Sequence, residues 1–256
     1  MLVDCSILLD RRTLFEWVFD TSTKENNSNL FVGAISHATV DKFIADHPKG
    51  AIKKLSIFSE GGELIASIRL GRWVKENNLD VEVNLLCMSG CANYVFPAGN
   101  KKTIGRNALV LWHGGAEQKD LRELQAKYER LISSNSSLDS SSSADEVRIF
   151  LAENKKKYLA IVEAREAQSK FFADIGVDEY ITRLGQEPIN YKIDAWTTTV
   201  RVMEKFGITN IEAAPDYGAL QQMRKNPLTA LLLRSEILTF DLDASGQVRR
   251  TEPSAK

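Results

Sequence analysis

Three short segments of this chain hold residues that could do chemistry together. They contain the glycine pair Gly61-Gly62, then Ser89, then His113, in that order along the sequence. A serine hydroxyl becomes a nucleophile when a histidine removes its proton, and backbone N–H groups can bind the oxyanion that forms. These residue types therefore indicate acyl transfer through a serine nucleophile.

Each of these segments directly follows a short apolar run that is typical of a buried strand. The runs cover residues 54–58, 81–86 and 108–112 and are rich in β-favouring residues, and a helical pattern over 63–77 separates the first two. In a parallel sheet with right-handed crossovers, the loops that leave the carboxyl ends of the strands lie at one edge. The sequence thus predicts an α/β fold with a mainly parallel sheet, and it places the glycine pair, the serine and the histidine at one edge.

The remaining pattern predicts shorter elements and a large insertion. We expect strands over 13–19, 30–35, 102–104 and 237–242, helices over 39–47 and 92–96, and a last helix-and-strand piece over 196–211. Gly71, on the apolar face of the 63–77 helix, would allow close approach to the sheet.

Between His113 and the last piece, a helical insertion occupies about 117–175. It consists of a charged helix at about 117–132, a serine-rich run at 133–143 that is interpreted as a mobile loop, and a long helix at 144–174. We expect the long helix to project and to support self-association. The main domain then covers 1–211, and 212–256 form a C-terminal extension.

Composition limits the classes of partner. The 256 residues carry a formal net charge of -1 with 43% hydrophobic and 26% charged residues, which is ordinary for a globular protein and gives no reason to expect a nucleic-acid partner. The lysine runs at 101–102 and 155–157 are interpreted as solvated faces. No apolar stretch approaches the roughly 18 residues that span a bilayer, and no export signal is visible. The sequence as written predicts a soluble cytoplasmic protein, or a periplasmic one if its N-terminus is incomplete.

Cysteine usage gives a weaker indication that the protein is not exported. The chain has three cysteines, so at least one thiol stays free, and a disulfide between Cys87 and Cys91 is conceivable only in an oxidising compartment. A zinc site on this pair would need two further ligands, and the only histidines are His37, His47 and His113. We expect no metal and no cofactor.

Each candidate residue also has a purely structural interpretation. Ser89 could be a helix N-cap, His113 could be a hydrogen-bonded loop residue, and Gly61-Gly62 could form a tight turn. Their joint placement on loops at the same sheet edge favours the functional interpretation.

The order of these motifs resembles that of the proteolytic subunit of Clp protease and its relatives in the crotonase superfamily. Within that group, residues 87–92 followed by Phe96-Pro97-Ala98-Gly99 are similar to small bacterial Clp-protease-like proteins. The resemblance covers residues 30–115 well and 190–211 weakly. It implies a superhelix of repeated β-β-α or βαβ units, a peptide or protein substrate and a homo-oligomer.

The resemblance also implies roles for particular residues. Ser89 would be the nucleophile, His113 the base and Asp194 the acid, while the loop of Gly61 and Gly62 and the residue after the serine, Gly90, would supply the oxyanion hole. Asp194 stands before Ala195-Trp196-Thr197-Thr198, as the family's acid does. Asp174 and Asp178 are alternatives, and Asp194 could instead be a plain charge at a helix N-terminus.

Two departures from the family stand out. Glu60 occupies a position where proline is usual, and docking features for an unfoldase ring are not recognisable. Two other function classes stay open: a catalytically silent binding or scaffold module, and a crotonase-type acyl-thioester enzyme that binds coenzyme A.

Overall fold

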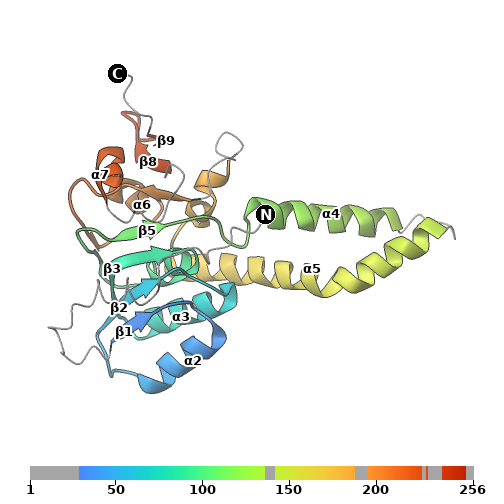
Figure 1. Cartoon of the computed structure of the whole chain (residues 1–256), viewed down its shortest axis with the longest axis horizontal. Coiled ribbons are helices and arrows are strands. Elements are labelled where there is room, and N and C mark those ends of the chain that lie inside the picture. The colour runs from blue at the N-terminus through green and yellow to red at the C-terminus, as the bar shows by residue number, and fades with distance from the viewer. Residues whose placement is uncertain (1–28, 136–141, 188–194, 227–228, 230–237, 252–256) are drawn as a thin grey trace.

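A parallel sheet forms the centre of the molecule (Figure 1). The computed structural model describes residues 29–135, 142–187, 195–226, 229 and 238–251. Its main sheet has the order β1-β2-β3-β4-β7, and β5 also pairs with β3. The strands are β1 (Leu30–Val32), β2 (Lys54–Ser59), β3 (Asp80–Met88), β4 (Lys102–Ile104), β5 (Leu109–Leu111) and β7 (Ile211–Glu212). Every pairing in this sheet is parallel, which confirms the predicted α/β class, whereas the described residues do not establish a repeated superhelix.

The long strand β3 pairs with two other strands, one along each half of its length. Its first half pairs with β4, with Val83 opposite Ile104, and its second half pairs with β5, with Met88 opposite Leu111. The end of β3 and the end of β5 therefore lie side by side. This pairing determines where the residues that follow the two strands are placed.

Helices cover the sheet through their apolar faces. α2 (His37–Asp46) begins at a capping box formed by Ser36 and Thr39, and α3 (Leu64–Glu76) buries seven of its thirteen residues. Gly71 does allow a close approach, but its neighbour is the backbone of Tyr94 in η2 (Cys91–Val95) and not a strand. The expectation was wrong because η2, which continues the chain after β3, packs directly on this face of α3.

The last part of the chain forms a second, small sheet. Its order is β6 (Trp196–Thr198), β8 (Leu238–Leu242) and β9 (Val248–Arg250), and α6 (Val200–Lys205) and α7 (Leu220–Lys225) accompany it. Trp196 exchanges two backbone hydrogen bonds of 2.8 and 2.9 Å with Trp112, directly after β5. Tyr217 adds a further link, because its hydroxyl accepts a 2.8 Å hydrogen bond from the backbone N–H of Val110. The second sheet thus supports the strand that leads to His113.

The predicted insertion is a helical hairpin that projects from the sheet (Figure 1). α4 (Lys119–Asn135) and α5 (Ser142–Ile175) run side by side, with the rings of Tyr128 and Tyr158 in contact at 5.6 Å. Both ends of the serine-rich run are helical, at 133–135 and 142–143, so the prediction of a loop over all of 133–143 was wrong there. Serine disfavours helix only weakly, and two adjoining helices extend into the run. Two short turns, η3 (Glu179–Thr182) and η4 (Leu184–Gln186), follow α5.

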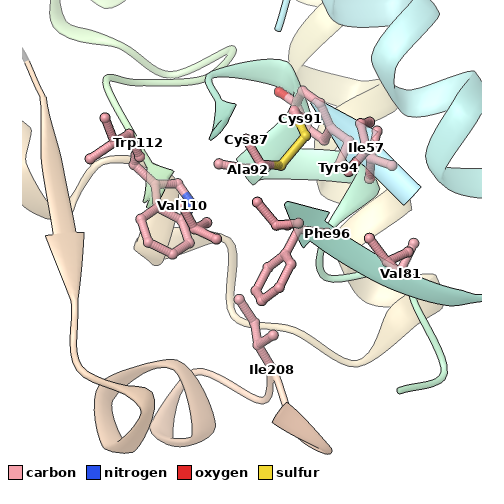
Figure 2. Close-up of a cluster of buried hydrophobic side chains, with 14 of the residues drawn as sticks. Ile57, Val81, Cys87, Cys91, Ala92, Tyr94, Phe96, Val110, Trp112 and Ile208 are labelled. Carbon is pink, nitrogen blue, oxygen red and sulfur yellow. A yellow bond between two sulfur atoms is a disulfide. The ribbon is translucent and has the colours of Figure 1, made fainter. Parts of the chain in front are cut away.

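The core gathers around β3, β5 and η2 (Figure 2). Trp112, Trp196, Tyr94 and Phe96 are among its largest fully buried side chains, and Phe171 and Phe172 of α5 contact Tyr94. No helix in the described ranges is long and apolar enough to cross a membrane. The predicted strand over 13–19 lies outside the described residues.

Candidate functional site

Ser89 adopts an unusual backbone conformation directly after β3. Its φ is +56°, and the only other described residues besides glycine with positive φ are Asn78 and Asn210. Asparagine is enriched in this left-handed region, whereas serine is not, and a conformation of this kind persists only where its surroundings impose it. The side chain is half-exposed at the sheet edge.

Hydrogen bonds fix both sides of this residue. The N–H of Ser89 donates to the carbonyl oxygen of Leu111 over 3.0 Å, and its carbonyl oxygen accepts from the N–H of Asn93 over 2.8 Å. The helical turn begins at Gly90, so Ser89 stands at its N-cap position and accepts the first helical hydrogen bond with its backbone carbonyl. Among the contacts of the described residues, the Ser89 side chain makes no cap hydrogen bond, so the interpretation of Ser89 as a side-chain cap is wrong.

A disulfide encloses the same turn. Cys87, near the end of β3, is bonded to Cys91, the first residue of η2, and both are completely buried. The sequence left this pairing open because it depends on the redox state of the compartment. Among the described residues no cluster of histidine, cysteine and acidic side chains could hold a metal ion.

The glycine pair contacts the serine turn. A Cβ atom on Gly61 would lie 2.6 Å from the Cβ of Ser89 and 2.7 Å from the nitrogen of Gly90, and the φ of Gly61 is +90°. Both facts require glycine there. The carbonyl of Gly61 accepts from Ile35 over 2.8 Å, and the N–H of Glu63 donates to Ile35 over 2.8 Å, so the loop is also tied to the chain after β1.

Gly62 and Gly90 lie next to one another in this contact. A Cβ on Gly90 would be 3.6 Å from the nitrogen of Gly62. Gly62 is exposed, whereas Gly90 is buried against Ser67 of α3. The glycine pair thus lies in a loop in which Gly62 forms a parallel bridge with Ile35, and this loop touches the Ser89 turn.

His113 follows β5 on the neighbouring strand end and is half-exposed. Because Ser89 bonds to Leu111, the turn that carries the serine lies beside the chain that leads into the histidine. The sequence argument predicted this neighbourhood from two consecutive sheet-edge loops.

Three buried or half-buried amide side chains hold the histidine loop, and the sequence analysis missed all of them. Gln186 donates to the carbonyl of His113 over 2.9 Å, Asn93 donates to the carbonyl of Gly114 over 2.7 Å, and Gln168 accepts from the N–H of Ala116 over 2.9 Å. Amides are common surface residues and give no local signal for such a role. The position of Asn93, four residues after Ser89, was the only available indication.

Gln168 extends this support to the projecting hairpin. Its side-chain oxygen also accepts from the hydroxyl of Tyr94 over 2.8 Å, and its nitrogen donates to Glu179 over 3.1 Å. Burial raises the pKa of Tyr94, so this hydroxyl stays protonated as a donor. α5, η2 and the histidine loop therefore meet at one buried amide.

Charged groups close the base of the hairpin beside this loop. The carboxylate of Glu117 binds Arg183 at 2.8 Å and also Arg165, and its side chain is only 14% exposed. Burial is the main cause that raises the pKa of Tyr180 to about 12, and the hydrogen bond and the charge of Glu187 contribute to the same shift. The loop after His113 is thus held at both ends by polar contacts.

The acid of the predicted triad, Asp194, lies outside the described residues. The chain that follows it passes close to the site, because Trp196 pairs with Trp112, the residue before His113. Asp174 and Asp178, the alternatives, are both exposed, and the carboxylate of Asp178 accepts a 2.9 Å hydrogen bond from Tyr180 as the cap of η3. Asp178 is thus already engaged in capping.

No model of a known protein family matches the chain, and no curated protein matches it. Among solved structures, the chain is similar to that of a ClpP1 mutant from Listeria monocytogenes. The identity is 14%, the TM-score is 0.41, and the match covers 74% of this chain and 94% of that chain. A likeness at this level carries no argument about mechanism.

Proposed function

We propose that the chain is a serine hydrolase that acts on peptides or proteins. The single observation that supports this best is Ser89, a half-exposed serine held at a φ of +56° at the carboxyl end of β3. Its N–H bonds to Leu111, two residues before His113. A strained turn that presents a serine at the edge of an α/β sheet is the arrangement in which α/β-hydrolases hold their nucleophilic serine.

The proposed mechanism assigns one role to each group. His113 takes the proton of Ser89 as the hydroxyl oxygen attacks the carbonyl carbon of the substrate, and it later returns that proton to the leaving group. The N–H groups of Gly62 and Gly90 bind the oxyanion, and each such donor typically contributes about 3 kcal/mol in the transition state. Asp194 orients the imidazole of His113.

Reaction with a fluorophosphonate tests this proposal, because such probes phosphonylate activated serines far faster than ordinary ones. We expect labelling at Ser89, its loss in Ser89→Ala, and a labelling rate at least about 100-fold lower in His113→Ala, since a general base typically contributes at least that factor. Ser245→Ala is the matched control, because Ser245 is an exposed serine whose hydroxyl donates to Asp243 over 2.6 Å.

The same experiment distinguishes the other function classes. A silent binding module would not react at Ser89, and an acyl-thioester enzyme would bind coenzyme A without labelling there. Labelling that persists in Ser89→Ala would overturn the proposal, as would reaction of serines within 133–143.

A further inference from the structure

We infer that the Cys87–Cys91 disulfide is a positioning element for Ser89, so that the nucleophile is competent only while this bond is oxidised. The inference rests on the proposed function. It assigns to the pair a role in the reaction beyond its contribution to folding.

The bond closes a small ring around the nucleophile. The two cysteines are four residues apart, so the ring contains only Met88, Ser89 and Gly90 between them. Ser89 has its positive φ inside this ring. A left-handed backbone conformation costs free energy for any residue that has a side chain. The covalent bond between the two flanking cysteines keeps the short segment from relaxing to an extended conformation.

Both cysteines are anchored in the hydrophobic core of the molecule. Cys87 and Cys91 are completely buried among hydrophobic side chains that include Ile57, Ala92 and Phe96 (Figure 2). Ser89, between them, is half-exposed. The ring thus joins two fixed points in the core and presents the serine at the surface.

Reduction would move these anchor points apart. A disulfide holds its sulfur atoms about 2 Å apart, whereas two thiols are non-bonded neighbours that need roughly 3.5–4 Å. A close-packed core cannot absorb that change without displacement. On its other side the serine turn packs against the Gly61 loop. The two are in contact only because Gly61 has no Cβ, so the serine turn cannot move further in that direction. The displacement therefore changes the position of Ser89 relative to that loop.

The redox step is an ordinary thiol–disulfide exchange. Because both cysteines are completely buried, the exchange takes place when the Ser89 turn opens locally. A thiolate of a dithiol then attacks one sulfur of the pair and releases the other cysteine as a thiolate, which takes up a proton. The second thiol of the reductant then displaces the first cysteine and forms its own cyclic disulfide. Two electrons pass to the protein, and Cys87 and Cys91 end as thiols.

The test compares fluorophosphonate labelling of Ser89 in three proteins, all carrying Cys5→Ser so that no cysteine other than Cys87 and Cys91 can contribute. They are the oxidised parent, the double variant Cys87→Ala/Cys91→Ala, and Leu79→Ala as a control. Leu79 is buried just before β3, at the opposite end of the strand from Ser89, so its truncation destabilises the core and keeps the disulfide.

We expect labelling of the double variant to be on the order of 10- to 100-fold slower than that of the parent, because a misplacement of about 1 Å can cost about 100-fold. Leu79→Ala should label at the parent rate below its melting temperature. Equal rates in the parent and the folded double variant would overturn the inference and leave the hydrolase proposal intact, whereas an unlabelled parent would overturn both.

Dithiothreitol treatment provides a second measurement that leaves Cys87 and Cys91 unsubstituted. The parent is reduced below its melting temperature, with circular dichroism confirming that it stays folded, and is then labelled. The rate should fall by the same factor and return after reoxidation with a disulfide oxidant. An unchanged rate in reduced, folded protein would contradict the inference.

Discussion

The side-chain amide of Asn93 donates a 2.7 Å hydrogen bond to the carbonyl oxygen of Gly114. Asn93 is only 2% exposed, and its own N–H bonds to the carbonyl of Ser89 over 2.8 Å. One residue thus connects the turn that carries the serine with the loop that follows His113.

Asn93→Ala should slow fluorophosphonate labelling of Ser89 on the order of tenfold or more, because the serine turn and the histidine loop lose their direct connection. It should also lower the free energy of unfolding by about 1–3 kcal/mol, since the buried carbonyl of Gly114 loses this donor. Labelling kinetics and chemical denaturation measure the two effects.

Asn77→Ala is the matched control. Asn77 likewise donates its amide to a backbone carbonyl, that of Trp73 over 2.8 Å, at the end of α3. In the described part of the chain, the side-chain oxygens of Asn77 and Asn93 are both buried without a partner. Equal loss of stability with equal labelling rates in the two variants would show that Asn93 has no positioning role.

Gly61→Ala should abolish most of the labelling, with a decrease on the order of 100-fold. The new Cβ would meet the carbonyl of Met88 at 2.5 Å and the Cβ of Ser89 at 2.6 Å, so the serine turn must shift. Gly50→Ala provides the comparison, because Gly50 has a φ of +85° and nothing within 4 Å of an added Cβ. If both variants label at similar rates, the contact of Gly61 with Ser89 has no influence on the nucleophile.

The projecting hairpin should mediate self-association. Ile149 and Leu159 of α5 are 58% and 52% exposed, and large apolar side chains on an extended helix favour a partner. We expect Ile149→Glu/Leu159→Glu to weaken association at least about tenfold in analytical ultracentrifugation, whereas Lys156→Glu, which adds charge on an exposed lysine of the same helix, should not. A parent chain that is a monodisperse monomer at high concentration would contradict the prediction.

Lys102 should make stability depend on alkaline pH. Burial, and secondarily the charge of Lys75, lowers the pKa of Lys102 to about 8, compared with about 10.4 for lysine in an unfolded chain. Between these values the unfolded state binds more protons, so the free energy of unfolding rises with pH across this window. Lys102→Met lacks this titration, and its stability relative to the parent should therefore fall between pH 8 and 10.4. Parallel denaturation profiles for the two proteins would rule out the shift.

The strands of the main sheet were predictable because their apolar runs are short, β-favouring and followed by glycine-bearing loops. β2, β3 and β5 appear where the sequence placed them, and α3 lies between the first two. The same rule brought the Gly61 loop and the Ser89 turn together, since loops at the carboxyl ends of parallel strands share an edge.

What the sequence missed depends on contacts between distant segments. Nothing near Gln168 or Gln186 indicates that their amides hold the loop after His113, because that role exists only once α5 and η4 lie against it. The Cys87–Cys91 bond depends on oxidation, which residue spacing does not encode. The second sheet was missed because the strand at 238–242 finds its partner, β6, about forty residues earlier in the chain.

The most direct test of the central claim is a crystal structure of the protein after reaction with a fluorophosphonate. The account predicts a phosphonyl group on the Oγ of Ser89, with its phosphoryl oxygen about 2.7–3.1 Å from the nitrogens of Gly62 and Gly90 and with the His113 imidazole beside it. An adduct on another residue, or a phosphoryl oxygen directed away from both glycines, would contradict it.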